Sequence, residues 1–108
     1  MVDDSRVAAL QDILRESPDD AFARYALGLE YSSAGDSDAA LAEFDRLLAA
    51  HPDYTNGYFM AAQVLERACR IEEARRMLEQ GMDCARRSNN RHALSEMEAM
   101  LEGLPPSE

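Results

Sequence analysis

The sequence predicts an all-α protein of about six antiparallel helices. Apolar residues recur at intervals of three and four almost throughout, and no stretch alternates with a period of two for long enough to form a strand. Certain residue types also recur at intervals of 34 residues, for example from Pro18 to Pro52 and from Ala40 to Ala74. A fixed interval of this length is typical of helix–turn–helix hairpins that stack on one another.

Five short breaks, most of them rich in Gly, Pro, Asn, Asp or Ser, separate the predicted helices. At the first break, Ser17 is suited to cap a helix and Pro18 to occupy its first position. At the second, Gly35 can adopt the left-handed conformation that ends a helix. We therefore expect helices over residues 4–16, 18–34, 37–50, 54–68, 71–87 and 90–103.

Two small residues stand among the large apolar side chains of the second and third helices. They are Gly28 and Ala40. Because Gly in mid-helix costs about 0.8–1 kcal/mol relative to Ala, its presence requires a compensating gain in packing. We expect the two residues to face each other where the helices cross closely, with Tyr31 and Phe44 filling the space on either side. Gly28 would then be structural and would not bind phosphate.

These residues resemble the tetratricopeptide repeat, whose pattern is Trp-x2-Leu-Gly-x2-Tyr, then Ala-x3-Phe, then Pro. Residues 21–54 match at every position except that of the Trp, where Arg24 stands; the matching residues are Leu27, Gly28, Tyr31, Ala40, Phe44 and Pro52. Residues 55–88 match more loosely, through Tyr58, Ala61, Ala62, Leu65, Ala74 and Leu78.

The resemblance implies a right-handed helical-repeat superhelix that forms a single domain over residues 1–108. Helix 4–16 would be half of a preceding repeat, and residues 21–54 and 55–88 would be the first and second repeats. Helix 90–103 would close the array as a C-terminal cap.

Charge and composition argue against several classes of partner. The 108 residues include 21 acidic and 11 basic ones, a formal net charge of −10, and residues 1–54 account for −8 of it. Such a charge repels phosphate backbones and anionic lipid headgroups, so we expect neither nucleic-acid nor membrane binding. No run of 18 apolar residues is present, and the acidic start MVDDSRVAAL is unlike a signal peptide. A cytoplasmic location is therefore expected.

The sequence contains no motif for catalysis or metal binding. Every basic residue other than His is Arg, which excludes a Lys Schiff base and a P-loop, and HExxH, GxGxxG, CxxC and GxSxG are absent. His51 and His92 have no further ligands at suitable spacing. Cys69 and Cys84 would lie about 20 Å apart along helix 71–87, too far for a disulfide. We expect no enzymatic activity, no metal and no cofactor.

In tetratricopeptide repeats the first helix of each hairpin lines a concave face, where ligands usually bind. The resemblance thus implies a groove lined by Phe22, Tyr25, Leu29, Ser33, Asn56, Phe59, Met60, Gln63 and Arg67. Family members that clamp acidic C-terminal peptides use Lys, Arg and Asn at these places, whereas Tyr25, Leu29 and Met60 stand here. We therefore expect no such clamp. A surface rich in aromatic and Met side chains suits an extended peptide or an amphipathic helix.

Two functions remain open at this point. The first is an adaptor that binds a peptide or helix of a partner protein in the groove. The second is a self-associating structural module, such as a homodimer, that uses its groove or its ends for subunit contacts. Helix 90–103 decides how much of the groove is open, because it would cover Phe59 and Met60 if it folded across the groove.

Overall fold

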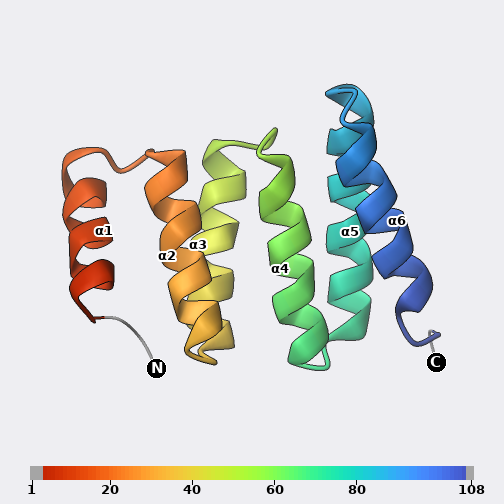
Figure 1. Ribbon diagram of the computed structural model, residues 1–108, viewed down its shortest axis with the longest axis horizontal. Helices are drawn as coiled ribbons and strands as arrows, with labels where there is room; N and C mark the ends of the chain where they lie inside the picture. The colour runs from red at the N-terminus through yellow and green to blue at the C-terminus, as the bar shows by residue number, and fades with distance from the viewer. Residues whose placement is uncertain (1–3, 107–108) are drawn as a thin grey trace.

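The computed structural model describes residues 4–106, and that range contains six α-helices and no strand (Figure 1). The helices are α1 (Asp4–Glu16), α2 (Ala21–Ser33), α3 (Ser37–Ala50), α4 (Thr55–Arg67), α5 (Ile71–Arg87) and α6 (Arg91–Gly103). The all-α prediction is confirmed. Three helices have the predicted bounds, and the other three are shorter than predicted by one to four residues.

The helices pack in pairs and form two layers. The most extensive contacts join α2 to α3 and α4 to α5. Smaller contacts join α3 to α4 and α5 to α6, and α4 also touches both α2 and α6. The helices α2, α4 and α6 therefore form one layer, backed by α3 and α5; in Figure 1, α2 lies in front of α3 and α6 in front of α5. The helix α1 packs on α2 alone.

The start of α2 differs from the prediction. The helix begins at Ala21, and the Asp20 carboxylate caps it by accepting a hydrogen bond of 2.8 Å from the Ala23 amide. The Asp20 amide in turn donates to the Ser17 carbonyl at 3.0 Å, which closes a turn over residues 17–20. Pro18 is well suited to the second position of such a turn. The expectation that Ser17 caps the helix and Pro18 opens it is therefore wrong.

Three helices end in the same left-handed turn. Gly35, Cys69 and Asn89 follow α2, α4 and α5, with φ of 81°, 61° and 59°. In each turn the next residue donates back to the helix, as the Asp36 amide does to the Tyr31 carbonyl at 3.0 Å. This hydrogen-bond pattern satisfies the last carbonyl groups of a helix. The sequence indicated such a turn at Gly35. Asn89 is a residue type that also adopts this region, whereas Cys69 is uncommon there.

The core lies between the two layers. Its largest fully buried side chains are Phe44, Leu47, Val64, Leu78, Cys84 and Met97. A separate small cluster, made of Val7, Leu10, Ala23 and Leu27, attaches α1 to α2. Gly28 is buried, as expected for a close helix crossing, but the ring of Phe44 lies directly over it rather than beside it. The atoms nearest to the space that glycine leaves are those of the Phe44 ring.

Candidate functional site

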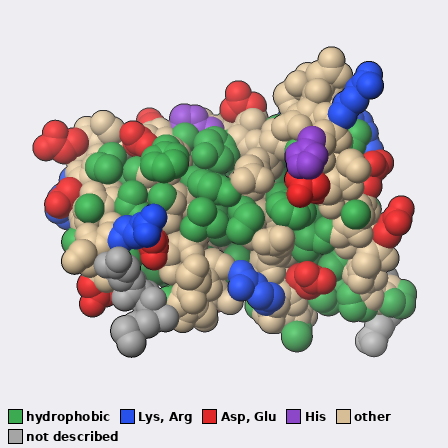
Figure 2. Space-filling model, in the orientation of Figure 1, with side chains coloured by type: hydrophobic (Ala, Val, Ile, Leu, Met, Phe, Trp, Pro, Cys, Tyr) green, Lys and Arg blue, Asp and Glu red, His purple; other side chains and the backbone are tan. Residues whose placement is uncertain are grey.

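The exposed face of α2 and α4 carries a continuous apolar surface. The opposite sides of both helices are buried against α3 and α5, so the remaining side chains project away from the core. Figure 2 shows hydrophobic side chains running across the middle of this face. The most exposed large apolar side chain among the described residues is Phe22, which is 71% accessible. A surface of this kind calls for an explanation, because exposed aromatic side chains in a contiguous patch are characteristic of binding sites.

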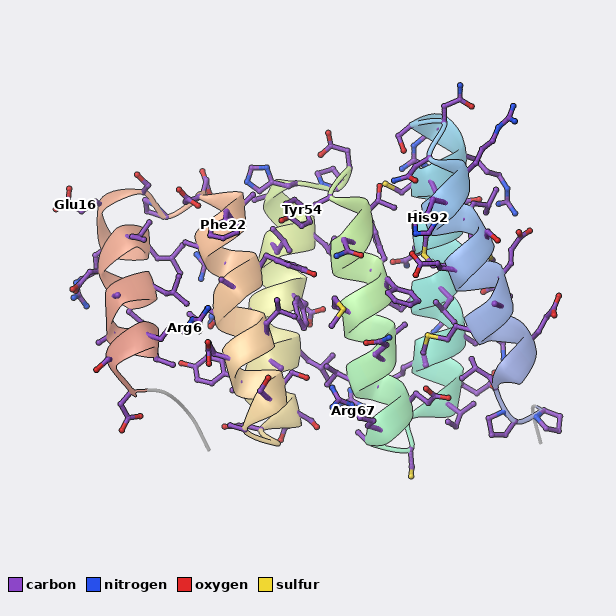
Figure 3. The ribbon with its side chains drawn as sticks, in the orientation of Figure 1. Arg6, Glu16, Phe22, Tyr54, Arg67 and His92 are labelled. Carbon is purple, nitrogen blue, oxygen red and sulfur yellow. The ribbon has the colours of Figure 1, made fainter. Side chains whose placement is uncertain are left out.

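An aromatic group forms one end of this surface, near the start of α2 and α4 (Figure 3). The Tyr25 ring packs against Tyr54 with centroids 5.3 Å apart and against Phe44 at 6.2 Å. The Asn56 side chain donates a hydrogen bond of 2.6 Å to the Tyr25 hydroxyl oxygen. Burial, followed by the neighbouring Tyr54, raises the pKa of Tyr25, although the Asn56 hydrogen bond acts in the opposite direction. These contacts hold Tyr25 in one position between the helices.

A depression of about 390 Å³ forms the other end. It is lined by Leu29, Ser32, Ser33, Met60, Gln63, Glu66 and Arg67. The Arg67 guanidinium donates to the Ser32 hydroxyl and bridges the ends of α2 and α4. Among residues 4–106, Arg67 has no carboxylate within ion-pair distance, and Glu66 is the acidic side chain that lines the same depression.

The structure brings most of the predicted groove residues together. Leu29, Ser33, Met60, Gln63 and Arg67 line one depression. Tyr25 and Asn56 are hydrogen-bonded at the aromatic end, and Phe22 is exposed on the first turn of α2. Phe59 is half-buried and packs on the core. That these residues form a binding surface stays a prediction.

Three further residues belong to this surface and are not in the predicted set. They are Tyr54, Ser32 and Glu66. Ser32 and Glu66 lie 34 residues apart in the sequence, at equivalent positions next to Ser33 and Arg67, so the repeat interval was a signal that could have found them. Tyr54 was expected to be the first residue of helix 54–68, but it is the residue before α4, so its side-chain direction is set by the turn and not by the helical register.

The last helix leaves the depression open. The helix α6 contacts α5 and α4 but not α2, so it extends the front layer instead of folding across it. Met60 accordingly remains on the open depression. Solvent-exposed positions of α6 include Arg91, Ser95, Glu98 and Glu102, which give the end of the array a polar outer face. A polar terminal face is what a stacked array requires in order not to associate further.

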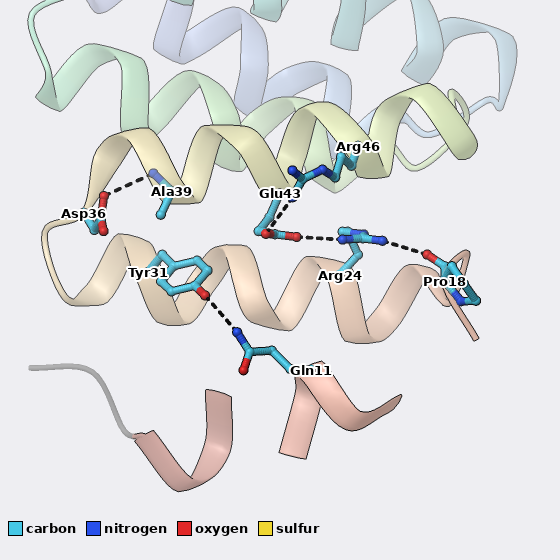
Figure 4. A network of polar contacts seen from close by, with 8 residues as sticks. All are labelled: Gln11, Pro18, Arg24, Tyr31, Asp36, Ala39, Glu43 and Arg46. Carbon is cyan, nitrogen blue, oxygen red and sulfur yellow. Dashed lines mark hydrogen bonds and ion pairs between the residues drawn. The ribbon is translucent and has the colours of Figure 1, made fainter. Parts of the chain in front are cut away.

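A buried charge network fixes α2 on α3 (Figure 4). Arg24, at the position of the missing Trp, donates to the Glu43 carboxylate at 2.9 Å and to the Pro18 carbonyl at 2.8 Å. Arg46 donates to the second Glu43 oxygen at 3.1 Å. The side chains of Arg24 and Glu43 are only 18% and 10% accessible. An ion pair thus takes the place of aromatic packing at this crossing.

The remaining candidate groups are separate from the groove. Within residues 4–106 no three His, Cys, Asp or Glu side chains are arranged to hold a metal ion. Cys69 is an exposed free thiol in the turn after α4, and Cys84 is a buried free thiol in α5. No helix in the described part of the chain is long and apolar enough to cross a membrane.

Known proteins are similar to this chain in sequence. A tetratricopeptide repeat family model matches residues 31–101. A TPR repeat-containing protein of Pseudomonas aeruginosa is 29% identical over 98 residues, which cover 91% of this chain and 93% of that protein.

Solved structures agree with this assignment. The solution structure of a Salinibacter ruber tetratricopeptide repeat domain protein has a TM-score of 0.77 and 33% identity, covering 85% of this chain and 96% of that one. A crystal structure of a tetratricopeptide repeat domain protein from the same organism has a TM-score of 0.72 and 34% identity, covering 80% of this chain and 99% of that one. The solution structure of a Bordetella parapertussis protein shares the fold, with a TM-score of 0.78 and 23% identity. The match covers 89% of this chain and 84% of that one. The chain therefore belongs to the tetratricopeptide repeat family.

Proposed function

We propose that this chain is a non-catalytic interaction module that binds a peptide or helix of a partner protein along α2 and α4. Membership of the tetratricopeptide repeat family favours protein–protein interaction in general. The choice of surface rests on one observation: Phe22 is 71% accessible on the same face as a depression lined by Leu29 and Met60. Apolar and aromatic side chains that stay exposed on a rigid scaffold are suited to bury against a partner.

The surface is suited to an elongated occupant. The groove follows α2 and α4, each of 13 residues and so about 20 Å long at 1.5 Å per residue. About six residues of extended peptide or four turns of helix span that length. The occupant would meet aromatic side chains at one end and the polar groups of Gln63 and Arg67 at the other. No carboxylate clamp is part of this proposal, because Tyr25, Leu29 and Met60 occupy the positions concerned.

Self-association is the second candidate, and the ends of the array give it little support. The described outer surface of α6 is polar, and α1 exposes one large apolar residue, Ile13, which is 45% accessible. A net charge of −10 also opposes the pairing of two identical chains. The groove itself remains available for a second copy, so the oligomeric state is measured along with partner binding.

Phe22 and Ile13 provide a matched test. Both are exposed large apolar residues, but only Phe22 is on the proposed surface. We expect Phe22→Glu bait to lose partner proteins that wild-type bait captures from the native cell, whereas Ile13→Glu bait retains them. Tyr25→Glu is a poorer test, because Tyr25 packs against the core at Phe44.

Two results would contradict the proposal. Equal capture by all three baits would show that partners bind elsewhere. A dimer in light scattering that becomes a monomer in Phe22→Glu, with no partner captured, would instead support self-association through the groove. Circular dichroism and thermal melts confirm that each variant is folded before either result is interpreted.

A further inference from the structure

We infer that the segment bound in this groove carries a Lys or Arg side chain at the end that lies near Phe22 and Tyr54. The inference rests on the proposed function, because it concerns the chemistry of the occupant of the same groove. Two features coincide at this end, namely exposed aromatic rings and carboxylates without an ion-pair partner. In addition, Arg67 lies in the depression at the other end of the groove.

The aromatic feature is the group formed by Phe22, Tyr25 and Tyr54. Phe22 is largely exposed, and the Tyr25 and Tyr54 rings are tilted at 43° to each other with centroids 5.3 Å apart. Ring faces carry a negative partial charge that attracts ammonium and guanidinium groups, and guanidinium groups also stack on them. The same rings bury the methylene stem of a Lys or Arg, so such a side chain gains both contacts here.

Carboxylates flank these rings. Asp19 and Asp20 precede Phe22 at the start of α2, and Asp53 directly precedes Tyr54. Figure 2 shows acidic side chains along the upper edge of this face, above the apolar surface. Asp20 accepts from the Ala23 amide, yet none of these three carboxylates has an arginine within ion-pair distance in residues 4–106.

Two arginines, Arg24 and Arg46, line a pocket with Asp19 and Asp20 but form their ion pairs elsewhere. All four arginines in residues 4–54 are paired with other carboxylates, namely Arg6 with Glu30, Arg15 with Asp12, and both Arg24 and Arg46 with Glu43. His51 is nearby, and its Nε2 lies 2.6 Å from the Asp19 carbonyl oxygen and not at the carboxylate. Residues 1–54 carry a formal net charge of −8, which attracts basic segments and accelerates their association.

The opposite end of the groove carries charges of both signs, because Glu66 and Arg67 both line the depression. There the Arg67 guanidinium faces the depression and has Ser32 as its hydrogen-bond partner. A basic side chain of the occupant is thus favoured beside Phe22, where the carboxylates have no ion-pair partner, over the end where Glu66 and Arg67 offset each other. This difference between the two ends orients a bound segment that carries its positive charge at one end.

A peptide selection tests the inference. A random 12-residue display library is selected against the full chain, and enriched peptides are compared for binding to wild type and to Phe22→Glu. We expect the enriched, Phe22-dependent peptides to contain apolar residues together with Lys or Arg. Enrichment of apolar peptides that depend on Phe22 but lack basic residues would overturn the inference and leave the proposed function standing. Failure to obtain any Phe22-dependent peptide would count against the proposed function itself.

The selected peptide then allows a charge test by fluorescence anisotropy. In Asp19→Asn/Asp53→Asn, both exposed carboxylates become neutral amides of the same shape. We expect the Kd to rise about three- to tenfold at low salt, and the difference to shrink at about 0.5 M salt, where charges are screened. The matched control, Glu98→Gln/Glu102→Gln on the outer face of α6, also removes two negative charges and should change the Kd by less than about twofold. An equal effect of both variants would show that only net charge matters and would overturn the inference.

Discussion

The ring of Phe44 in α3 packs directly against the backbone of Gly28 in α2. A Cβ atom added to Gly28 would lie 2.7 Å from Phe44 Cε1 and 2.8 Å from Phe44 Cζ. Phe44 is completely buried, so its ring is enclosed on all other sides. The absence of a side chain at position 28 is therefore what allows a large aromatic residue to fill the middle of the first hairpin.

Gly28→Ala should destabilise the protein by about 1–2 kcal/mol. Alanine gains up to about 1 kcal/mol of helix propensity, but overpacking a filled core typically costs about 1–3 kcal/mol. Urea denaturation followed by circular dichroism measures the free energy of unfolding. The control is Gly103→Ala, since a Cβ there meets nothing within 4 Å. That variant should be unchanged or slightly stabilised, and a similar loss in both variants would contradict the explanation.

The sequence predicted this crossing only in part. Helical periodicity located every helix, and a small residue at position 28 indicated close packing. Which side chain fills the space depends on the relative rotation and shift of α2 and α3, and one-dimensional spacing does not contain that information. Gly81 illustrates the same limit: a Cβ there would lie 2.6 Å from both Met97 Sδ and Tyr58 Cβ, and nothing in the spacing pointed to it.

Cys69→Gly should stabilise the protein by about 0.5–1 kcal/mol. Cys69 has a φ of 61°, in the left-handed region that costs a side-chain-bearing residue about 1–2 kcal/mol, and the greater freedom of glycine in the unfolded chain offsets part of the gain. Gly35, with a φ of 81° and open space around it, supplies the reverse test. Gly35→Ala should lose stability although nothing collides. If Cys69→Gly were destabilising in urea titrations, the exposed thiol would have a packing role that its position does not suggest.

Glu43→Ala should cost about 2 kcal/mol, because it leaves the largely buried Arg24 guanidinium without its carboxylate partner. The double variant Arg24→Ala/Glu43→Ala should lose less than the sum of the two single losses, since no charge is then left unpaired. Arg46, whose side chain is 61% accessible, is the control, and Arg46→Ala should cost less than about 1 kcal/mol. If the two single losses of stability, measured by urea denaturation, summed to the loss in the double variant, Arg24 and Glu43 would not act as a pair.

The residues of the candidate site could be predicted from the sequence more fully than this ion pair. Arg24 was evident as a departure from the repeat pattern, but its partner on α3 is 19 residues away and becomes apparent only in three dimensions. The groove residues follow from the repeat register, which assigns one side of α2 and α4 to the same face. Tyr54 was placed in the predicted helix 54–68 but precedes α4, and its place beside Tyr25 depends on the path of the turn.

Raising the pH above about 10 should weaken the fold in part through Tyr25. Burial and the neighbouring Tyr54 raise the pKa of Tyr25 above its ordinary value of 10.0, so the folded state retains this proton more strongly than the unfolded state does. The stability that it contributes is complete below pH 10 and is lost as the pH rises through the raised pKa. Tyr25→Phe should cost at most about 1 kcal/mol at pH 7, through loss of the Asn56 hydrogen bond.

Because phenylalanine does not ionise, the gap between wild type and Tyr25→Phe should narrow between pH 10 and 11 in urea denaturation. Tyr54 and Tyr58 also have pKa values raised by burial, so the variant should keep a weaker alkaline dependence. A gap that stays constant from pH 7 to 11 would show that Tyr25 ionises equally in the folded and unfolded chain. Such a result would mean that the aromatic end of the groove is more open to water than its ring contacts imply.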